Sequence, residues 1–428
     1  MRVLSTRGRG ARAAQDFLSR LLTGSEASYE RALPAAQRIV QGVRRGGDAA
    51  LLRYRAKFDG IAASDPLRIT AEEMEAAWKA TSAELKAALK LAAKNIRRFA
   101  QKQRPRDFTL QMAPGVTAGQ KVIPLEAVGC YVPSGRYPLP STLLMTAIPA
   151  QVAGVRRIVA VSPRPAKETL AAAHLLGITE FYRIGGAQAV AALAYGTASI
   201  ERVDKIVGPG NAYVTAAKKA VSFDCGIDML AGPTEIVVAS ENGTVEGIAA
   251  DLIAQAEHDP DAIAILVTSN AELGRAVAAE TKLHAKSNAI AKQSIAANGA
   301  VILTRDVEEA RMLTNRLAAE HLTVDSSADL AWVRHAGSVF VGRWSSQPLG
   351  DYVSGPNHTL PTSGLARLRG GLSVMDYLKL VTVQEYSAAG VRQLGPSAVA
   401  LAEAEGLVGH ADAVRVRLQS AKPVRRRA

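Results

Sequence analysis

The stretch DLIAQAEHDP, residues 251–260, places an amide and an imidazole at helical spacing. Gln255 and His258 are three residues apart, so both project from one face of a helix. Apolar residues at Ile248, Leu252 and Ala256 predict that another face of this helix is buried. We therefore expect the C-terminal end of a helix to present a side-chain oxygen and an imidazole nitrogen together, and both atoms are able to bind a metal ion.

Four of the seven histidines lie in polar, glycine- or proline-rich, or acid-bearing neighbourhoods: His258, His321, His358 and His410. For each of them, a packed structural role is the alternative to a role in a site. Zinc accepts imidazole nitrogen and carboxylate oxygen in tetrahedral geometry. One set of side chains would supply one amide oxygen, two imidazoles and one carboxylate: Gln255, His258, Asp351 and His410. Their spacing in the sequence is too long to identify a site without further information.

Two further pairs combine an acid with an imidazole. Glu320 and His321 are adjacent in NRLAAEHLTVD, and from a helix end both would reach one cavity, where they suit two separate proton transfers. Asp351 and His358 are seven residues apart in the Gly- and Pro-rich loop LGDYVSGPNHTLPTSG. The alternatives are a helix-terminal glutamate beside a packed histidine, and an ordinary surface turn.

The composition predicts a soluble globular protein. The 428 residues are 48% hydrophobic and 21% charged, which suits two or three domains with buried cores. Cys130 and Cys225 are the only cysteines, which excludes a disulfide framework and a thiolate zinc finger. No apolar run reaches the roughly 18 residues of a membrane span, and MRVLSTRGRGARAAQ lacks the features of a secretory signal. We therefore expect a cytoplasmic protein with no membrane partner.

The net charge of +13 makes nucleic-acid binding an alternative function. Basic residues concentrate in KNIRRFAQKQRPRD (94–107) and KPVRRRA (422–428), without interleaved aromatic residues for base stacking. No RNA- or DNA-binding module is recognisable. We therefore expect no specific nucleic-acid partner, and a surface that attracts anionic small molecules.

Short apolar runs that end in glycine or proline alternate with helical stretches from about residue 120 onward. AVGCYVP, RRIVAVSP, EFYRIGG and KIVGPG form one series, and EIVVAS, AIAILVTS, AVILTR and GSVFVG form a second. This alternation is typical of parallel sheets, whereas residues 10–105 and 385–420 are mostly helical in pattern. The predicted fold class is α/β, with two Rossmann-like, incomplete parallel-sheet domains and small helical N- and C-terminal extensions.

Two glycine-rich turns follow predicted strands, IGGAQA (184–189) and VGPGNA (207–212). Such turns let the backbone approach a phosphate, and the following helix presents N–H groups to an anion. Neither turn is the GxGxxG fingerprint of dinucleotide-binding domains, so tight turns that need positive φ are an equal alternative. Gln188 and Asn211 are the polar side chains that these turns offer to a ligand.

Eight segments, in order along the chain, carry a resemblance to a known family: YVPSGRYPLPSTLLMTAIPAQVAG, IGGAQAVAALAYGT, DKIVGPGNAYV, IDMLAGPTEIVV, DLIAQAEHDP, AEHLTVD, GDYVSGPNHTLPT and EAEGLVGHADAVRVR. They lie between about residue 120 and residue 417 and resemble those of histidinol dehydrogenase. The resemblance implies an enzyme of histidine biosynthesis that depends on one Zn²⁺ per subunit. Such an enzyme oxidises L-histidinol through L-histidinaldehyde to L-histidine and reduces two NAD in sequence.

The resemblance also implies the roles of single residues. The zinc ligands would be Gln255, His258, Asp351 and His410, which would also contact the substrate. His321 would take the proton of the substrate hydroxyl, and Glu320 would activate the water that attacks the aldehyde. His321 would contact the substrate as well, together with Thr234, His358 and Glu405. The nucleotide contacts would be Tyr131, Gln188 and Asn211.

A division into domains follows from the same resemblance. Residues 1–22 would form an N-terminal helical extension, residues 23–120 with 236–376 the metal-binding catalytic α/β domain, and residues 121–235 the NAD-binding α/β domain. Residues 377–428 would form a C-terminal helical extension that is exchanged in a homodimer. Glu405 and His410 would then complete the active site of the other chain.

The sequence departs from the family pattern at three places. Thr234 stands where serine is common, the turn reads VPSG rather than VPGG, and AAEH replaces APEH. These changes spare every proposed ligand and proton-transfer residue, so they bear on substrate fit. Two other functions stay open: a zinc- and NAD-dependent dehydrogenase of the same architecture that acts on another small polar alcohol, and a basic binding protein without catalysis.

Overall fold

The computed structural model describes residues 1–24, 26–135 and 137–421, so the basic tail 422–428 lies outside the described residues. The chain divides into two compact units, one of residues 1–103 with 125–377 and one of residues 104–124 with 378–428. Within the described ranges, no helix has the length and apolar character needed to cross a membrane.

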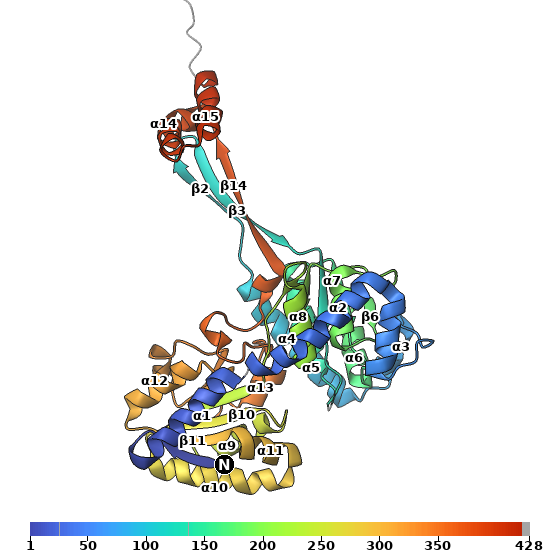
Figure 1. The fold of residues 1–428 in the computed structure, drawn as a ribbon, viewed down its shortest axis with the longest axis vertical. Helices are drawn as coiled ribbons and strands as arrows, with labels where there is room; N and C mark the ends of the chain where they lie inside the picture. Colours follow the sequence, from blue (N-terminus) through green and yellow to red (C-terminus); the bar gives the residue numbers. More distant parts are fainter. Residues whose placement is uncertain (25, 136, 422–428) are drawn as a thin grey trace, which may run out of the picture. The chain divides into compact units, whose positions relative to one another are not determined.

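A six-stranded parallel sheet lies in the first unit (Figure 1). Its strand order is β1-β11-β10-β9-β12-β13. The strands are β1 (Arg2–Ser5), β9 (Glu235–Ala239), β10 (Ile263–Thr268), β11 (Gly299–Leu303), β12 (His321–Val324) and β13 (Ser338–Val341). The N-terminal extension, which we predicted as helical, therefore contributes an edge strand that pairs with β11 as well as a helix.

Helices cover both faces of this sheet because its strands are apolar on both sides. Successive side chains of a strand point to opposite faces. Val237 packs in a core with helices α1 (Ala11–Gly24) and α12 (Val307–Leu317). Ile236 and Val238 pack in a second core. The helices of that second core are α9 (Val245–Ala256), α10 (Ala271–His284) and α11 (Ala289–Asn298).

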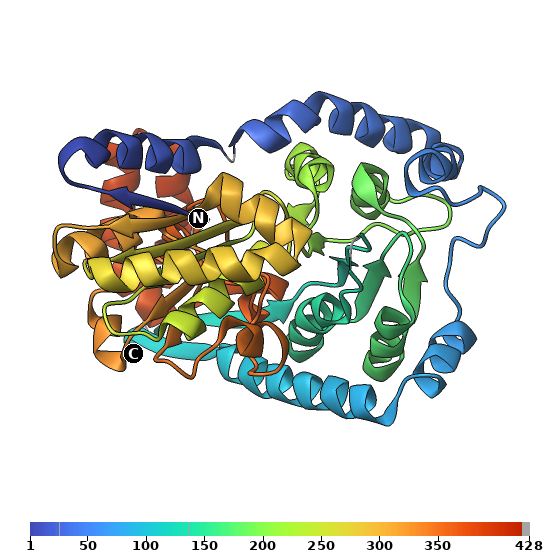
Figure 2. The ribbon, with the colours of Figure 1, turned by 90° about the horizontal axis from the view of Figure 1, so that it is seen from below.

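A five-stranded parallel sheet forms the other half of the first unit, in the order β6-β5-β4-β7-β8. Its strands are β4 (Ala127–Tyr131), β5 (Arg157–Val161), β6 (Glu180–Tyr182), β7 (Lys205–Val207) and β8 (Gly226–Ile227). The helices beside it are α5 (Pro140–Ala153), α6 (Lys167–Leu176), α7 (Gly186–Tyr195) and α8 (Ala212–Val221), and they lie on both faces (Figure 2). The two parallel sheets confirm the predicted α/β class.

Both sheets reverse their strand order at a corresponding place. The chain starts the five-stranded sheet at β4, adds β5 and β6 on one side, and then crosses over to β7 and β8 on the other. The six-stranded sheet repeats this order from β9, with β1 added at its edge. This is the order of a doubly wound fold, in which ligands bind where the order reverses. The sequence alone did not reveal this internal similarity.

Helix α1 is followed by α2 (Glu26–Tyr54), α3 (Ala71–Lys79) and α4 (Ala83–Gln103), which precede the strands of the five-stranded sheet. Helix α2 packs on α7 and α8, α3 on α6, and α4 on α5. Ala36, Val40 and Val43 of α2 belong to the core beneath the five-stranded sheet. This packing differs from the predicted grouping of residues 23–120 with 236–376, because the apolar faces of these helices meet helices of the other sheet.

The second unit is built from a three-stranded antiparallel sheet and a pair of helices. The strands are β2 (Phe108–Ala113), β3 (Val116–Pro124) and β14 (Leu378–Tyr386), in the order β14-β3-β2. Helices α14 (Ala388–Ala404) and α15 (Val408–Ser420) pack against each other. The segment predicted as a C-terminal helical extension thus contains two helices, but it begins with a nine-residue strand.

Candidate active site

A cavity of about 210 Å³ lies at the amino ends of β9 and β12. Thr234 directly precedes β9, Glu320 directly precedes β12, and His321 is the first residue of β12. The two strands are paired in parallel with His321 opposite Ile236, the second residue of β9, so the beginnings of the two strands lie side by side. Six of the predicted site residues line this cavity: Thr234, His258, Glu320, His321, Asp351 and His358.

The Glu320 carboxylate is buried and fixed by two donors. The Thr234 hydroxyl donates to Glu320 Oε2 at 2.5 Å, and the Glu235 backbone N–H donates to the same oxygen at 2.9 Å. Helix α12 ends at Leu317, so Glu320 lies on the short connection to β12 rather than at the predicted helix end. Both donors bind Oε2, so neither occupies Oε1, and Oε1 is available for a proton transfer.

The His321 imidazole lies between two carboxylates. Its Nε2 is 3.3 Å from Asp351 Oδ1, and its Nδ1 is 3.2 Å from the backbone oxygen of Glu235 and 3.5 Å from Glu320 Oε2. Burial alone would lower the pKa of His321, but the charges of Glu320 and Asp351 outweigh it and raise that pKa to about 10. The site therefore strongly stabilises an imidazolium at this position.

Gln255 lies in the last turn of α9 with its side chain fully buried. Its Nε2 donates to the Thr234 hydroxyl, whereas its Oε1 has no hydrogen-bond partner. A buried amide oxygen without a partner costs about 1–3 kcal/mol, which a ligand at this oxygen would remove. His258 follows two residues beyond the end of α9, so the two side chains do not share a helical face as we predicted.

Asp351 and His358 come from a segment that we predicted as a loop, but Asp351 lies in the short helix α13 (Gln347–Tyr352). The Gln347 amide donates to Asp351 Oδ2 at 3.1 Å, one helical turn away. His358 Nδ1 is 2.8 Å from the backbone oxygen of Asp351, and its Nε2 is 3.4 Å from the Thr142 hydroxyl. Burial lowers the pKa of His358, which favours its neutral form.

Glu405 and His410 belong to the second unit, whereas the other predicted site residues belong to the first. Glu405 caps the end of α14, His410 lies in the first turn of α15, and both are exposed. Among the described residues, no group of three or more His, Cys, Asp and Glu side chains is arranged to hold a metal ion. The four predicted zinc ligands are therefore divided between two units of the chain.

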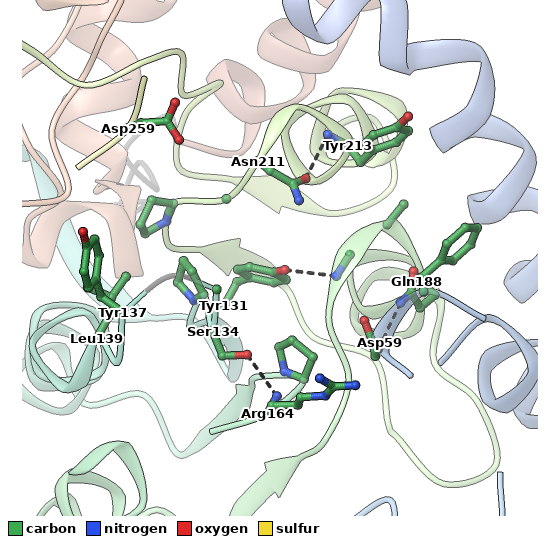
Figure 3. Close-up of a pocket in the computed structure, with 18 of the residues that line it drawn as sticks. Asp59, Tyr131, Ser134, Tyr137, Leu139, Arg164, Gln188, Asn211, Tyr213 and Asp259 are labelled. Carbon is green, nitrogen blue, oxygen red and sulfur yellow. Dashed lines mark hydrogen bonds between the residues drawn. The ribbon is translucent and has the colours of Figure 1, made fainter. Parts of the chain in front are cut away.

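The three residues predicted to contact the nucleotide line one larger cavity of about 890 Å³ (Figure 3). The Tyr131 hydroxyl accepts the backbone N–H of Gly186 at 3.0 Å, and burial raises the pKa of Tyr131 to about 12, so the phenol is neutral. Asn211 Oδ1 caps helix α8 by accepting two backbone N–H groups. Helix α7 begins at Gly186 without a side-chain cap. Two helix N-termini thus lie beside this cavity.

Sequence reasoning missed Asp59, a carboxylate at this larger cavity. Its Oδ2 accepts the backbone N–H of Gly185 and the Nε2 of Gln188, each at 3.1 Å. Asp59 is separated from these partners by 126 and 129 residues, so no local pattern indicates the contact. Gln347, which orients Asp351, was also missed because its spacing to Asp351 is that of any residue pair on one helical turn.

The two cavities share part of their walls. Four residues line both: Leu139, Pro209, Gly210 and His258. The larger cavity lies at the carboxyl ends of β4 and β7, where the order of the five-stranded sheet reverses. The smaller cavity lies at the amino ends of β9 and β12, where the order of the other sheet reverses. A ligand in one cavity would therefore lie next to a ligand in the other.

Comparisons with known proteins agree on one family. A family model described as histidinol dehydrogenase matches residues 22–418. The chain is 47% identical to histidinol dehydrogenase of Geobacillus kaustophilus, covering 92% of this chain and 96% of that protein. It is 49% identical to the enzyme of Syntrophotalea carbinolica, covering 89% and 91%. The crystal structure of histidinol dehydrogenase from Elizabethkingia anophelis superposes with a TM-score of 0.87 at 36% identity, covering 90% and 92% of the two chains.

Proposed function

The chain belongs to the histidinol dehydrogenase family, whose members are NAD-dependent oxidoreductases, and we propose the finer details of how this chain carries out that reaction. The proposal is a four-electron oxidation of L-histidinol through L-histidinaldehyde to L-histidine, with two NAD in sequence, one Zn²⁺ per subunit and active sites shared in a homodimer. The observation that carries it is the common wall of the two cavities, because hydride transfer needs the two reactants side by side.

The sizes and walls of the cavities suit the two reactants. About 890 Å³ beside two helix N-termini suits a dinucleotide, whose pyrophosphate the N–H groups of α7 and α8 would bind. About 210 Å³ lined by carboxylates and imidazoles suits a small amino alcohol with an imidazole ring. Tyr131, Gln188 and Asn211 would hold the nucleotide. NAD, when bound, supplies the hydride acceptor.

The chemistry of the donor set in the first unit fits zinc. Gln255 contributes a buried amide oxygen without a partner, and His258 and Asp351 contribute an imidazole and a carboxylate at the same cavity. His410 would be the fourth ligand. Zinc, when bound, supplies a Lewis acid that polarises an oxygen of the substrate. With one carboxylate and three neutral ligands, the site keeps a net charge near +1, which suits a neutral or anionic oxygen ligand.

The proton transfers are assigned to the two residues at the start of β12. His321 in its neutral form takes the proton of the substrate hydroxyl in the first oxidation and that of the hydrated aldehyde in the second, and the carboxylates of Glu320 and Asp351 stabilise the imidazolium that forms. Because these carboxylates raise the pKa of His321 to about 10, alkaline pH favours the neutral base. Glu320 takes a proton from the water that attacks the aldehyde. Thr234, His358 and Glu405 would hold the substrate between the two steps, because a free amino aldehyde is lost from the reaction.

A homodimer would complete the active site. The second unit exposes many large apolar side chains, which is typical of a surface that another chain covers: Leu110, Met112, Leu401, Val408 and Val416 are each more than half exposed. His410 and Glu405 lie in this unit. In an exchanged dimer they would join Gln255, His258 and Asp351 of the other chain.

Stoichiometry tests the reaction, and complementation tests the sharing of sites. Limiting L-histidinol and excess NAD should yield about two NADH per histidinol consumed, whereas one NADH with released aldehyde would contradict the four-electron reaction. His258→Ala and His410→Ala homodimers should both be inactive. After the two variants are unfolded and refolded together, heterodimers should regain about a quarter of the wild-type activity if sites are shared, because half of the dimers are mixed and each holds one intact site. No regain would contradict sharing.

A further inference from the structure

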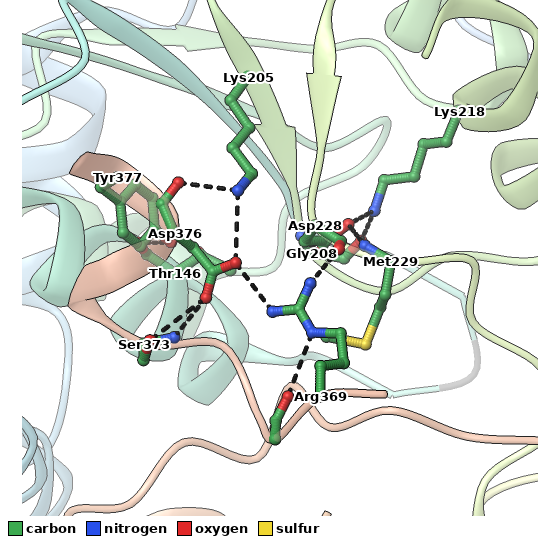
Figure 4. A network of polar contacts seen from close by, with 11 residues as sticks. Thr146, Lys205, Gly208, Lys218, Asp228, Met229, Arg369, Ser373, Asp376 and Tyr377 are labelled. Atoms are coloured by element: carbon green, nitrogen blue, oxygen red, sulfur yellow. Dashed lines mark hydrogen bonds and ion pairs between the residues drawn. The ribbon is translucent and has the colours of Figure 1, made fainter. Parts of the chain in front are cut away.

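A buried ion pair outside the proposed reaction machinery lies next to the wall that separates the two cavities. Lys218 Nζ of α8 is 2.5 Å from Asp228 Oδ1, which directly follows β8 (Figure 4). The side chains of Lys218 and Asp228 are 3% and 1% exposed. Removing two charges from water is costly, and apolar residues of similar volume are often as stabilising. The position of this pair therefore calls for an explanation beyond stability.

The ion pair engages both polar groups of one backbone residue. The N–H of Gly208 donates to Asp228 Oδ2 at 2.7 Å, and Lys218 Nζ donates to the Gly208 carbonyl at 2.6 Å. The second carboxylate oxygen, Oδ1, also accepts the N–H of Met229 at 2.6 Å. Gly208 is therefore held from both sides by a single pair of charged side chains, and each bond is charge-assisted.

Gly208 opens the turn that forms the shared wall. It follows β7 directly and precedes Pro209 and Gly210, which line both cavities. Its φ of +111° is readily adopted only by glycine. A Cβ atom at this position would also lie 2.2 Å from the backbone oxygen of Tyr131. A side chain therefore cannot anchor this turn by packing. The charged pair supplies the anchor instead.

The strand that enters the turn has a further anchor of its own. Lys205 Nζ, at the start of β7, donates to the Asp376 backbone oxygen at 2.8 Å, and Arg369 donates to Asp376 Oδ1 at 2.8 Å (Figure 4). Arg369 also donates to the backbone oxygen of Asp228. The start of β7 is thus held through Asp376 and the first residue of the turn through Lys218 and Asp228, and Arg369 connects the two groups. Removing the charges of Lys218 and Asp228 leaves the bond between Lys205 and Asp376 in place, so we expect the turn to move more than the strand.

We propose that Lys218 and Asp228 are positioning residues for hydride transfer, because they set the place of the 208–210 turn between the nucleotide and the substrate. Asp228 borders the smaller cavity, but its two carboxylate oxygens are engaged by Lys218, Gly208 and Met229, so we assign neither side chain a part in the chemistry. They act through the Gly208 backbone, and a shift of the turn by a fraction of an ångström changes the distance between the hydride donor and its acceptor. This inference rests on the proposed function of the two cavities.

The test uses the full-length, zinc-loaded enzyme and histidinol that carries deuterium at both carbinol positions. The main variant is Lys218→Met/Asp228→Asn, which removes both charges without leaving one buried alone, and Asp228→Asn is the milder second variant. The matched control is Arg157→Met/Glu180→Gln, which removes another ion pair of the same sheet, one that lines neither cavity. Folding is compared by thermal unfolding, and zinc content is measured for every protein.

The expected result is a fall of kcat by about tenfold or more and a larger deuterium isotope effect in the Lys218 and Asp228 variants, with zinc content unchanged. A merely structural role lowers the active fraction but leaves the isotope effect at the control value, and that outcome overturns the proposal. If the double variant fails to fold, the isotope effect of Asp228→Asn is compared with the control instead: a larger value supports the proposal, and the control value overturns it. If unsubstituted enzyme forms no NADH from histidinol, the proposed function fails instead.

Discussion

The hydroxyl of Thr234 donates to Glu320 Oε2 at 2.5 Å, so the residue before β9 orients the carboxylate before β12. The same hydroxyl accepts the amide of Gln255. One side chain thus connects the oxygen proposed to bind zinc with the carboxylate proposed to activate water. The connection explains how threonine suffices where the family commonly has serine: only the hydroxyl is used in these two bonds.

Substitutions of Thr234 should distinguish the contribution of its hydroxyl to kcat from that of its methyl group. Thr234→Val keeps the shape but leaves the Gln255 amide and Glu320 Oε2 each short of a partner, and a buried polar group without a partner costs about 1–3 kcal/mol. We expect kcat for the second oxidation to fall by about tenfold or more. Thr234→Ser should stay within a few-fold of the unsubstituted enzyme. Equal losses in the two variants would show that the methyl group, not the hydroxyl, matters.

Glu320→Gln should affect the two half-reactions unequally. Glutamine keeps an oxygen that accepts from Thr234 and Glu235, but it cannot take a proton from water. The oxidation of histidinol to the aldehyde should therefore survive better than the oxidation of added L-histidinaldehyde. The measurement is single-turnover NADH formation from each compound. Equal decreases of both rates would remove Glu320 from water activation.

Two buried glutamines allow a matched test of the zinc site. Gln255→Ala removes the amide oxygen that lacks a partner, and we expect the zinc content to fall well below one per chain. Gln188→Ala removes a buried amide at the other cavity and should leave zinc content unchanged while raising the KM for NAD. The measurement is the zinc content per chain of both variants after gel filtration. Full zinc content in Gln255→Ala would contradict its assignment as a ligand.

Glu235 should make the folded protein less stable as the pH rises. Burial and the neighbouring Glu320 carboxylate raise the pKa of Glu235 to about 8, far above its value of about 4.3 in an unfolded chain. Between these values the folded state holds one more proton than the unfolded state. The contribution of this group to stability is therefore complete at low pH and is lost progressively as the pH rises toward about 8.

Glu235→Gln isolates this contribution because glutamine imitates the protonated acid and keeps an acceptor for the backbone N–H of Ser363. The free energy of unfolding of both proteins should be measured by denaturant titration between about pH 5 and pH 9. The variant should gain stability relative to the unsubstituted protein as the pH rises. A difference that stays constant with pH would place the pKa of Glu235 outside this range.

Features that depend on local sequence pattern were predicted well. The apolar runs of β4, β5, β9 and β10 indicated parallel strands because both faces of these sheets are buried, and the structure confirms the α/β class. The family was indicated by eight segments, seven of which contribute residues to the walls of the two cavities, and the comparisons confirm the family. The roles of single residues and the zinc stay predictions.

Features that depend on distant contacts were not predicted. The bond between Asp59 and Gln188 joins residues 129 positions apart, and the pairing of β1 with β11 joins the first residues of the chain to residues near 300. The helical spacing of Gln255 and His258 also misled us, because the helix ends at Ala256 and the imidazole lies on the turn that follows. Periodicity describes the inside of a helix better than its last residue.

The placement of Glu320 and His321 at the beginning of β12 has a consequence for protein engineering. β12 is paired on both sides, with β9 and β13, so a shift of one residue in its register would turn every side chain of the strand to the opposite face. Insertions and deletions near residue 320 are therefore poor material for directed evolution. Variation that leaves the acid and base in place, at Leu139, Thr142 or Thr362 of the cavity wall, offers a route to enzymes for other amino alcohols.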